Sequence, residues 1–146
     1  MLKSAKLRPA LPIQDHMPKP AAKLIPVTAR TLPETSAPDP ARVLSGTPQN
    51  RTWNAHETPD GAFFAGIWES DAGCWAIDYT EAEFCHILEG ESRLTDADGT
   101  VTTVRKGDAF VIPSGFSGTW EVVTRTRKHY AIYTMPFGHE ISQYKE

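Results

Sequence analysis

The sequence predicts an all-β domain, either a sandwich or a barrel, that follows an extended proline-rich arm. Two observations lead to this prediction: the composition changes sharply near residue 50, and turn signals recur at short, regular spacing after it. Nine of the twelve prolines lie at or before Pro48, where they exclude regular helix and central strands. We therefore expect an extended or partly disordered arm over residues 1–42, the barrel over residues 43–136 and a tail over residues 137–146.

Turn signals divide the barrel region into short strands. Segments such as Pro-Asp-Gly at residues 59–61 and Pro-Ser-Gly at residues 113–115 favour turns, and Asp-Gly at residues 98–99 is a strong hairpin signal. No stretch between these turns has room for a long helix. The expected strands cover residues 62–68, 74–79, 83–88, 92–95, 101–104, 109–112, 118–123 and 128–134.

The bulk composition excludes several classes of function. A length of 146 residues fits one domain, and a net charge of -3 without a basic run argues against a nucleic-acid partner. The apolar runs are far too short to cross a bilayer, so we expect no membrane partner. Two cysteines, Cys74 and Cys85, are too few for a disulfide framework, and residues 1–12 lack an apolar leader segment. These features favour a cytoplasmic location.

Three segments carry a resemblance to a known family: residues 66–100 with EFCHILEG, residues 106–123 with GDAFVIPSGF and GTWEV, and residues 127–134 with RKHY. Together they resemble the small single-domain cupins of the (S)-ureidoglycine aminohydrolase cupin-domain family, within the RmlC-like cupin superfamily. The resemblance covers residues 43–134. It implies a double-stranded β-helix, which is a jelly-roll barrel with a small-molecule pocket at one mouth, and a homodimer.

The metal-binding histidines of the wider cupin pattern are missing from this sequence. Glu83 stands where the motif has its glutamate, but Ile77 and Tyr79 stand where it has two histidines. Gly118 occupies the place of the third histidine. A transition metal needs three or four well-placed N, O or S ligands, so we expect no metal cofactor.

Strand alternation indicates which side chains share a face. The resemblance implies that Glu83 points into the barrel, and Cys85 then points inward as well. Trp75 and Tyr79 share a face of the preceding strand, and Trp120 lies on the face of the lost third ligand. We expect Tyr79, Cys85, Trp75 and Trp120 to bind the ligand. The alternative is that the cysteine and the tryptophans are ordinary core residues.

A buried glutamate without a cation is costly, so something should compensate for Glu83. Lys128 begins the last strand, and the family resemblance places a lysine there. We expect a Lys128–Glu83 ion pair inside the barrel as the candidate catalytic pair. The alternatives are a protonated or hydrated Glu83 at the barrel mouth, and a zinc or manganese site of Glu83, Tyr79 and Cys85 with His129. His129 itself is expected to face away from the barrel.

Several functions are compatible with this sequence. The first is a small-molecule binding cupin of unknown activity. The second, implied by the resemblance, is a metal-dependent enzyme of the ureidoglycine aminohydrolase type. The third is a non-catalytic dimeric module that senses a ligand or assists an enzyme. The fourth is a metal-independent isomerase or epimerase in which Tyr79 and Lys128 act as acid and base.

Overall fold

The computed structural model describes residues 20–134, and the predictions for residues 1–19 and for the tail lie outside this part of the chain. The predicted all-β class is confirmed, with a single short 3-10 helix, η1, at Pro40–Arg42 among the described residues. The strands are β1 Glu34–Ser36, β2 Val43–Gly46, β3 Asn50–Glu57, β4 Phe63–Ser70, β5 Gly73–Asp78, β6 Ala82–Asp96, β7 Val101–Arg105, β8 Ala109–Ile112 and β9 Ser117–Tyr133.

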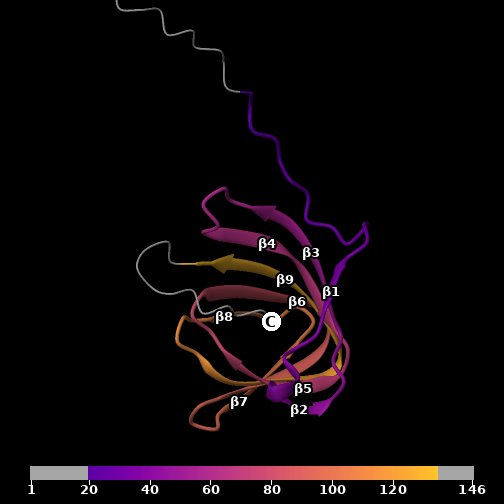
Figure 1. Cartoon of the computed structure of the whole chain (residues 1–146), viewed down its shortest axis with the longest axis vertical. Helices are drawn as coiled ribbons and strands as arrows, with labels where there is room; N and C mark the ends of the chain where they lie inside the picture. The colour runs from indigo at the N-terminus through magenta and orange to yellow at the C-terminus, as the bar shows by residue number, and fades with distance from the viewer. Residues whose placement is uncertain (1–19, 135–146) are drawn as a thin grey trace, which may run out of the picture.

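Two long antiparallel strands, β6 and β9, form the centre of the sheet. They pair with one another from Ala82–Tyr133 to Asp96–Gly118. The other edge of β9 pairs first with β5 and then with β4, and the other edge of β6 pairs with β8 and β7. The strands β4 and β8 thus flank one end of the central pair, and β5 and β7 flank its other end. The whole sheet curls on itself, as Figure 1 shows. This is the jelly-roll barrel that the sequence predicted.

A bulge at Gly90 explains why two predicted strands form a single strand. Gly90 has φ +87°, and the β6–β9 register shifts between Ile87 and Ser92. A Cβ atom on Gly90 would lie 2.0 Å from the carbonyl oxygen of Arg125, so no other residue fits there. The gap expected between the strands of residues 83–88 and 92–95 is therefore a β-bulge, and the strand continues through it. Likewise, the strands expected over residues 118–123 and 128–134 form the single strand β9, which ends at Tyr133.

The sequence did not predict three strands near the start of the domain, β1, β2 and β3. Residues 34–36, which were expected to belong to the arm, pair with β3 at the edge of the sheet. The chain just before them is held by Trp53, whose Nε1 donates to the carbonyl oxygen of Thr31 at 2.7 Å. Further out, Leu24 is fully exposed, so it makes no docking contact within this chain.

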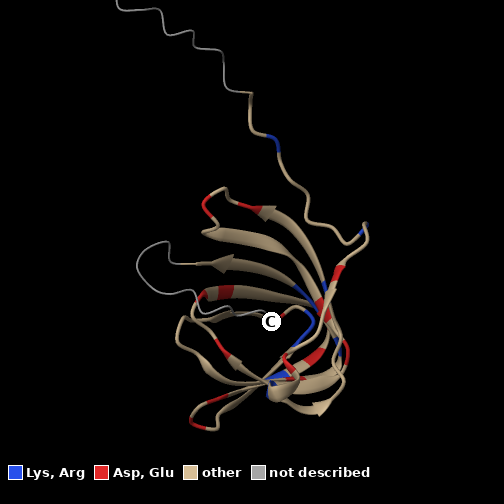
Figure 2. Ribbon diagram, viewed as in Figure 1, with Lys and Arg blue, Asp and Glu red and all other residues tan. Residues whose placement is uncertain are grey.

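The core fills the space inside the curled sheet. Its buried side chains alternate along the strands, and the bulge changes which positions of β6 face inward. Before the bulge Cys85 and Ile87 are buried, and after it Ser92 and Leu94 are buried. Acidic and basic residues are interspersed over strands and turns (Figure 2). Within residues 20–134, no helix is long and apolar enough to cross a membrane.

The bulge generates a test with a matched control. Gly90 and Gly99 both have positive φ, but a Cβ atom meets backbone at Gly90 and nothing within 4 Å at Gly99. We expect Gly99→Ala to cost about 1 kcal/mol of unfolding free energy from backbone strain. Gly90→Ala should cost about 3 kcal/mol or more, because the added methyl group forces β6 and β9 apart. Urea denaturation measures both losses, and equal losses would contradict a bulge held by close packing.

Candidate functional site

The inner face of the barrel contains the ion pair expected from the sequence. Lys128 on β9 lies with its Nζ 2.5 Å from Oε1 of Glu83 on β6. Glu83 is fully buried and Lys128 is 1% exposed. Trp68 is the residue paired with Lys128 in the β4–β9 register. The predicted Lys128–Glu83 pair is therefore confirmed as a contact, and any catalytic role for it stays a prediction.

Two indole rings enclose the ammonium group of Lys128. Its Nζ lies 4.7 Å from the ring centroid of Trp68 and 4.5 Å from that of Trp120. The two rings meet edge to face, with centroids 5.5 Å apart. A cation over an aromatic face is attracted by the ring quadrupole, and most strongly where water is excluded. The two tryptophans thus replace part of the hydration that Lys128 loses on burial.

The thiol of Cys85 completes this cluster. Its Sγ donates to Oε1 of Glu83 at 3.2 Å, and Nζ of Lys128 lies 3.7 Å away. A nucleophilic thiol needs a base nearby. The carboxylate of Glu83 lies two residues away on the same face of the strand, and the spacing of residues 83 and 85 alone indicates this. Cys85 has no exposed surface, so the thiol is a buried hydrogen-bonding group in this structure.

A cavity of about 380 Å³ opens on the same inner face. Its lining residues come from β1, β3, β4, β9 and the turn before β6: Glu34, Ser36, Thr52, Asn54, Glu57, Phe64, Trp68, Glu81, Tyr130 and Ile132. The hydroxyl of Tyr130 donates to Oδ1 of Asn54 at 2.7 Å across β3 and β9. Gly66 makes room for this phenol, because a Cβ atom there would lie 2.5 Å from the hydroxyl oxygen.

Trp68 connects the cavity with the ion pair. Its side chain lines the cavity and also lies against the ammonium group of Lys128. Neither Trp68 nor Tyr130 was singled out from the sequence as a ligand-binding residue. Alternation did contain a signal for Tyr130, because it shares the inner face with Lys128 two residues earlier. Asn54 could not be found in this way, because β3 was not predicted.

The four expected ligand-binding residues lie in the barrel core. Tyr79 is 5% exposed and packs edge to face on Phe116, at 6.5 Å between ring centroids. Trp75 is 3% exposed and stands opposite Trp120 in the β5–β9 register. Together with Cys85 they fill the interior, and among the described residues none of the four lines the cavity near Tyr130. Their role in binding stays a prediction.

The donor atoms present do not fit the metal that the resemblance implies for such barrels. Within residues 20–134 there is no group of three or more His, Cys, Asp and Glu side chains that could hold an ion. His129 faces away from Glu83 and stacks on His86, with ring centroids 6.1 Å apart. Burial, followed by the neighbouring imidazole, lowers the pKa of His129. An ammonium group lies against Glu83, where a metal would otherwise bind.

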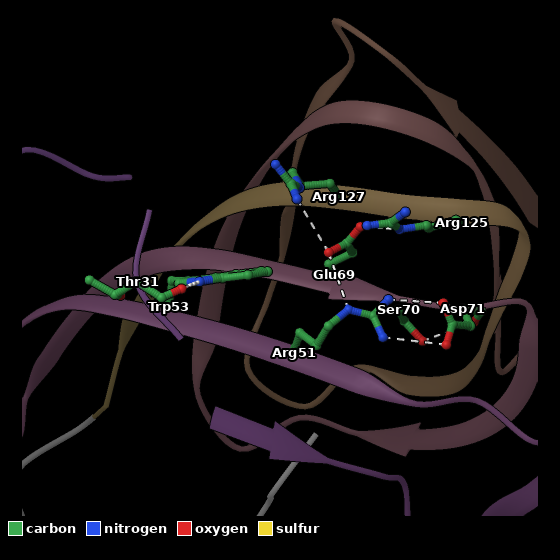
Figure 3. Close-up of polar contacts among 8 residues, drawn as sticks. All are labelled: Thr31, Arg51, Trp53, Glu69, Ser70, Asp71, Arg125 and Arg127. Atoms are coloured by element: carbon green, nitrogen blue, oxygen red, sulfur yellow. Dashed lines mark hydrogen bonds and ion pairs between the residues drawn. The ribbon is translucent and has the colours of Figure 1, made fainter. Parts of the chain in front are cut away.

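The outer face carries a second buried carboxylate, Glu69 at the end of β4 (Figure 3). Glu69 is 1% exposed, and its Oε2 lies 3.3 Å from Nε of Arg51 and 3.3 Å from Nη2 of Arg127. Arg125 forms an ion pair with the other carboxylate oxygen. Nη2 of Arg51 also lies 2.9 Å from Oδ1 of Asp71. This cluster joins β3, β4 and β9 on the face opposite the cavity.

The arginines determine the protonation of Glu69. Burial by itself raises the pKa of this carboxyl, but the hydrogen bonds from Arg125 and Arg51 and the charge of Arg127 outweigh it. The pKa of Glu69 is therefore lowered from its ordinary value of 4.5. A lowered pKa in the folded state means that the carboxylate stabilises the fold above that ordinary value.

The inner pair generates a stability test with a control on the same two strands. Lys128→Met leaves Glu83 buried without its cation, which should cost about 3–5 kcal/mol of unfolding free energy. The double variant Lys128→Met/Glu83→Gln should recover part of that loss. Arg93 and Glu121 also pair across β6 and β9, at 3.0 Å, but both are exposed, so Arg93→Met should cost less than about 1 kcal/mol. Similar losses in urea denaturation would refute a special cost for the inner pair.

The outer cluster generates a pH test. Because the folded-state pKa of Glu69 is lowered, its stabilisation is complete above the ordinary value of 4.5 and is lost as pH falls through the folded-state value. Glu69→Gln should therefore be less stable than the wild type at neutral pH, and the difference should shrink below pH 4.5. Urea midpoints over a pH series measure this. Glu57→Gln, at an exposed position outside the cluster, is the matched control and should stay close to the wild type, and a constant deficit for Glu69→Gln would contradict the argument.

Solved structures with a similar fold include proteins of several descriptions. A protein of unknown function from Pseudomonas syringae pv. tomato matches with a TM-score of 0.67 at 27% identity, over 73% of this chain and 46% of that protein. A candidate ethanolamine utilization protein Q from Salmonella typhimurium matches with a TM-score of 0.52 at 24% identity, over 57% of this chain and 68% of that protein. The chain therefore spans less than half the length of the Pseudomonas protein.

A more distant match shows the fold alone. It is a protein from Thermotoga maritima described as a predicted oxalate decarboxylase, with a TM-score of 0.59 at 17% identity, over 77% of this chain and 100% of that protein. No curated protein is significantly similar to the chain.

The sequence model of the EutQ-like cupin domain matches residues 57–130. This range contains Glu83, Lys128, Trp68 and Tyr130, and therefore the inner ion pair and the aromatic wall of the cavity. The cupin barrel expected from the sequence is confirmed, whereas the finer assignment to the ureidoglycine aminohydrolase family is not. The chain belongs to the family of EutQ-like cupin domains.

Proposed function

We propose that this cupin domain binds a small molecule in the cavity lined by Trp68, Tyr130 and Asn54. The observation that carries the proposal is the cavity itself, about 380 Å³ on the inner face of the barrel. Cavities of this size accommodate small metabolites, and the mouths of β-barrels are frequent binding sites. Phe64, Trp68 and Ile132 supply an apolar wall, and the polar side chains of β1 and β3 could orient a ligand.

In this proposal the Lys128–Glu83 pair supports the cavity from behind. The pair is at most 1% exposed, and Trp68, which is part of the cavity wall, lies against its ammonium group. A group in contact with a bound ligand should be reachable from the cavity, and Tyr130 meets this condition better than Lys128. We therefore favour binding over acid–base catalysis by the pair.

The other hypotheses have weaker support. An activity of the ureidoglycine aminohydrolase type is expected to use a metal, and the described donor atoms do not fit one. An isomerase with Tyr79 as its acid would need this phenol at the ligand, whereas Tyr79 packs on Phe116. A ligand-sensing module needs the same cavity and is one form of the present proposal. The expected homodimer stays a prediction.

The cavity can be blocked at one edge strand to test the proposal. Ser36 lines the cavity, and the adjacent Thr35 alternates to the other face of β1. A ligand at about 100 times its Kd stabilises the fold by about 2.7 kcal/mol, so thermal denaturation with a metabolite panel detects it. We expect stabilising ligands to act on the wild type and on Thr35→Trp, and to lose their effect on Ser36→Trp. A panel without any stabilising member, or one that acts equally on both variants, would overturn the proposal.

The same ligands separate binding from catalysis. We expect a ligand to be recovered unchanged after prolonged incubation with the wild type. Conversion of the ligand that Glu83→Gln abolishes, while the folded variant still binds it, would instead assign catalysis to the Lys128–Glu83 pair.

A further inference from the structure

The charges around the cavity have one sign. Three of the ten lining residues are glutamates, Glu34, Glu57 and Glu81, and none is a lysine or an arginine. They come from separate parts of the chain: β1, the end of β3 and the turn before β6. Folding therefore brings three carboxylates to the same opening. A concave site lined by one sign of charge concentrates ligands of the opposite sign.

The wall of the cavity favours the same kind of ligand. Phe64, Trp68 and Tyr130 provide three aromatic side chains on the inner face. Aromatic faces attract organic cations, and several rings around one site are a known means of holding an ammonium group. Trp68 also has a buried indole nitrogen without an acceptor among the described residues, although it is 3% exposed and belongs to the cavity wall. A buried donor without an acceptor is uncommon in folded proteins, and this one belongs to a residue of the cavity wall.

The buried ammonium group of Lys128 does not cancel the preference of the cavity for a cationic ligand. The charge of Lys128 is neutralised by Glu83 at 2.5 Å, and the ammonium group lies against the rings of Trp68 and Trp120. An anionic ligand would meet three carboxylates with no cationic side chain in the lining. An organic cation would meet the carboxylates at the opening and the aromatic side chains along the wall.

We propose that the ligand of this cavity is a small organic ammonium ion, such as a primary amine, a diamine or a quaternary amine. This inference rests on the proposed small-molecule binding and names the class of that ligand. The carboxylates of Glu34, Glu57 and Glu81 attract the cation, the aromatic wall holds its carbon skeleton, and Asn54 and Tyr130 bind polar groups that it carries.

Charge can be tested separately from shape with matched compounds. Isothermal titration calorimetry of the full chain compares choline with its neutral carbon isostere, and putrescine with butanediol and with succinate. We expect the ammonium compounds to bind at least about tenfold more tightly than their isosteres, a difference of about 1.4 kcal/mol. Their Kd should rise with ionic strength, because salt screens partly exposed carboxylates.

Glutamate variants locate the binding. Glu34→Gln, Glu57→Gln and Glu81→Gln should each weaken binding of the ammonium compound by roughly threefold, the range expected of partly exposed charges. Glu89→Gln is the matched control, because Glu89 is exposed on β6 and lies outside the cavity lining. It should leave the Kd unchanged.

The outcomes distinguish this inference from the proposed function. If neutral or anionic compounds bind more tightly than the ammonium compounds, and Ser36→Trp abolishes their binding, the ligand is not an ammonium ion. The cavity would still be the binding site. Ammonium binding that Ser36→Trp and the three lining variants leave intact would overturn the assignment to this cavity. If none of these compounds and no member of the metabolite panel binds, both proposals fail.

Discussion

The inner face of this barrel depends on one buried ion pair, Lys128–Glu83. Removing two charges from water costs several kcal/mol for each ion, and a single contact at 2.5 Å does not restore all of it. The surroundings provide the rest: the thiol of Cys85 donates to the carboxylate, and the rings of Trp68 and Trp120 enclose the ammonium group. Because β6 and β9 pass through both halves of the sheet, the pair joins the two strands on which the whole barrel is built.

Trp68 gives the pair a consequence for the ligand. The indole belongs both to the environment of Lys128 and to the wall of the cavity, so a change at either one reaches the other through a single rigid side chain. The aromatic ring also keeps the interior charges away from the water of the cavity. In the proposed site the carboxylates at the opening would determine the charge preference, and the buried cation would contribute packing and rigidity. A barrel without the histidines of the wider cupin pattern can in this way retain a shaped interior.

The inner face was predicted well because a family resemblance and a local property agree there. The resemblance implied that Glu83 points inward and places a lysine at position 128, strand alternation placed Cys85 on the face of Glu83, and the structure buries all three. The bulge at Gly90 was predicted as a break between two strands, since a glycine with positive φ serves in turns and in bulges and long-range pairing decides between them. A pocket was expected, but the residues that line the cavity were missed because two of its strands, β1 and β3, showed no recognisable pattern. Its lining is the product of contacts between distant segments, which spacing along the chain does not contain.

Neighbouring residues of β4 and β9 form charged contacts on opposite faces of the sheet, and these contacts fix the register of the two strands. In the pairing of β4 with β9, Trp68 stands opposite Lys128 on the inner face, and Glu69 stands opposite Arg127 on the outer face. A slip by one residue would turn Lys128 toward solvent and bury an arginine among the tryptophans. Glu69 would stay on the outer face of β4, but it would lose the guanidinium groups of Arg125 and Arg127 that hold it ionised. The charges on both faces therefore disfavour the alternative pairing together, and the inner ion pair forms only in the register that also builds the cavity.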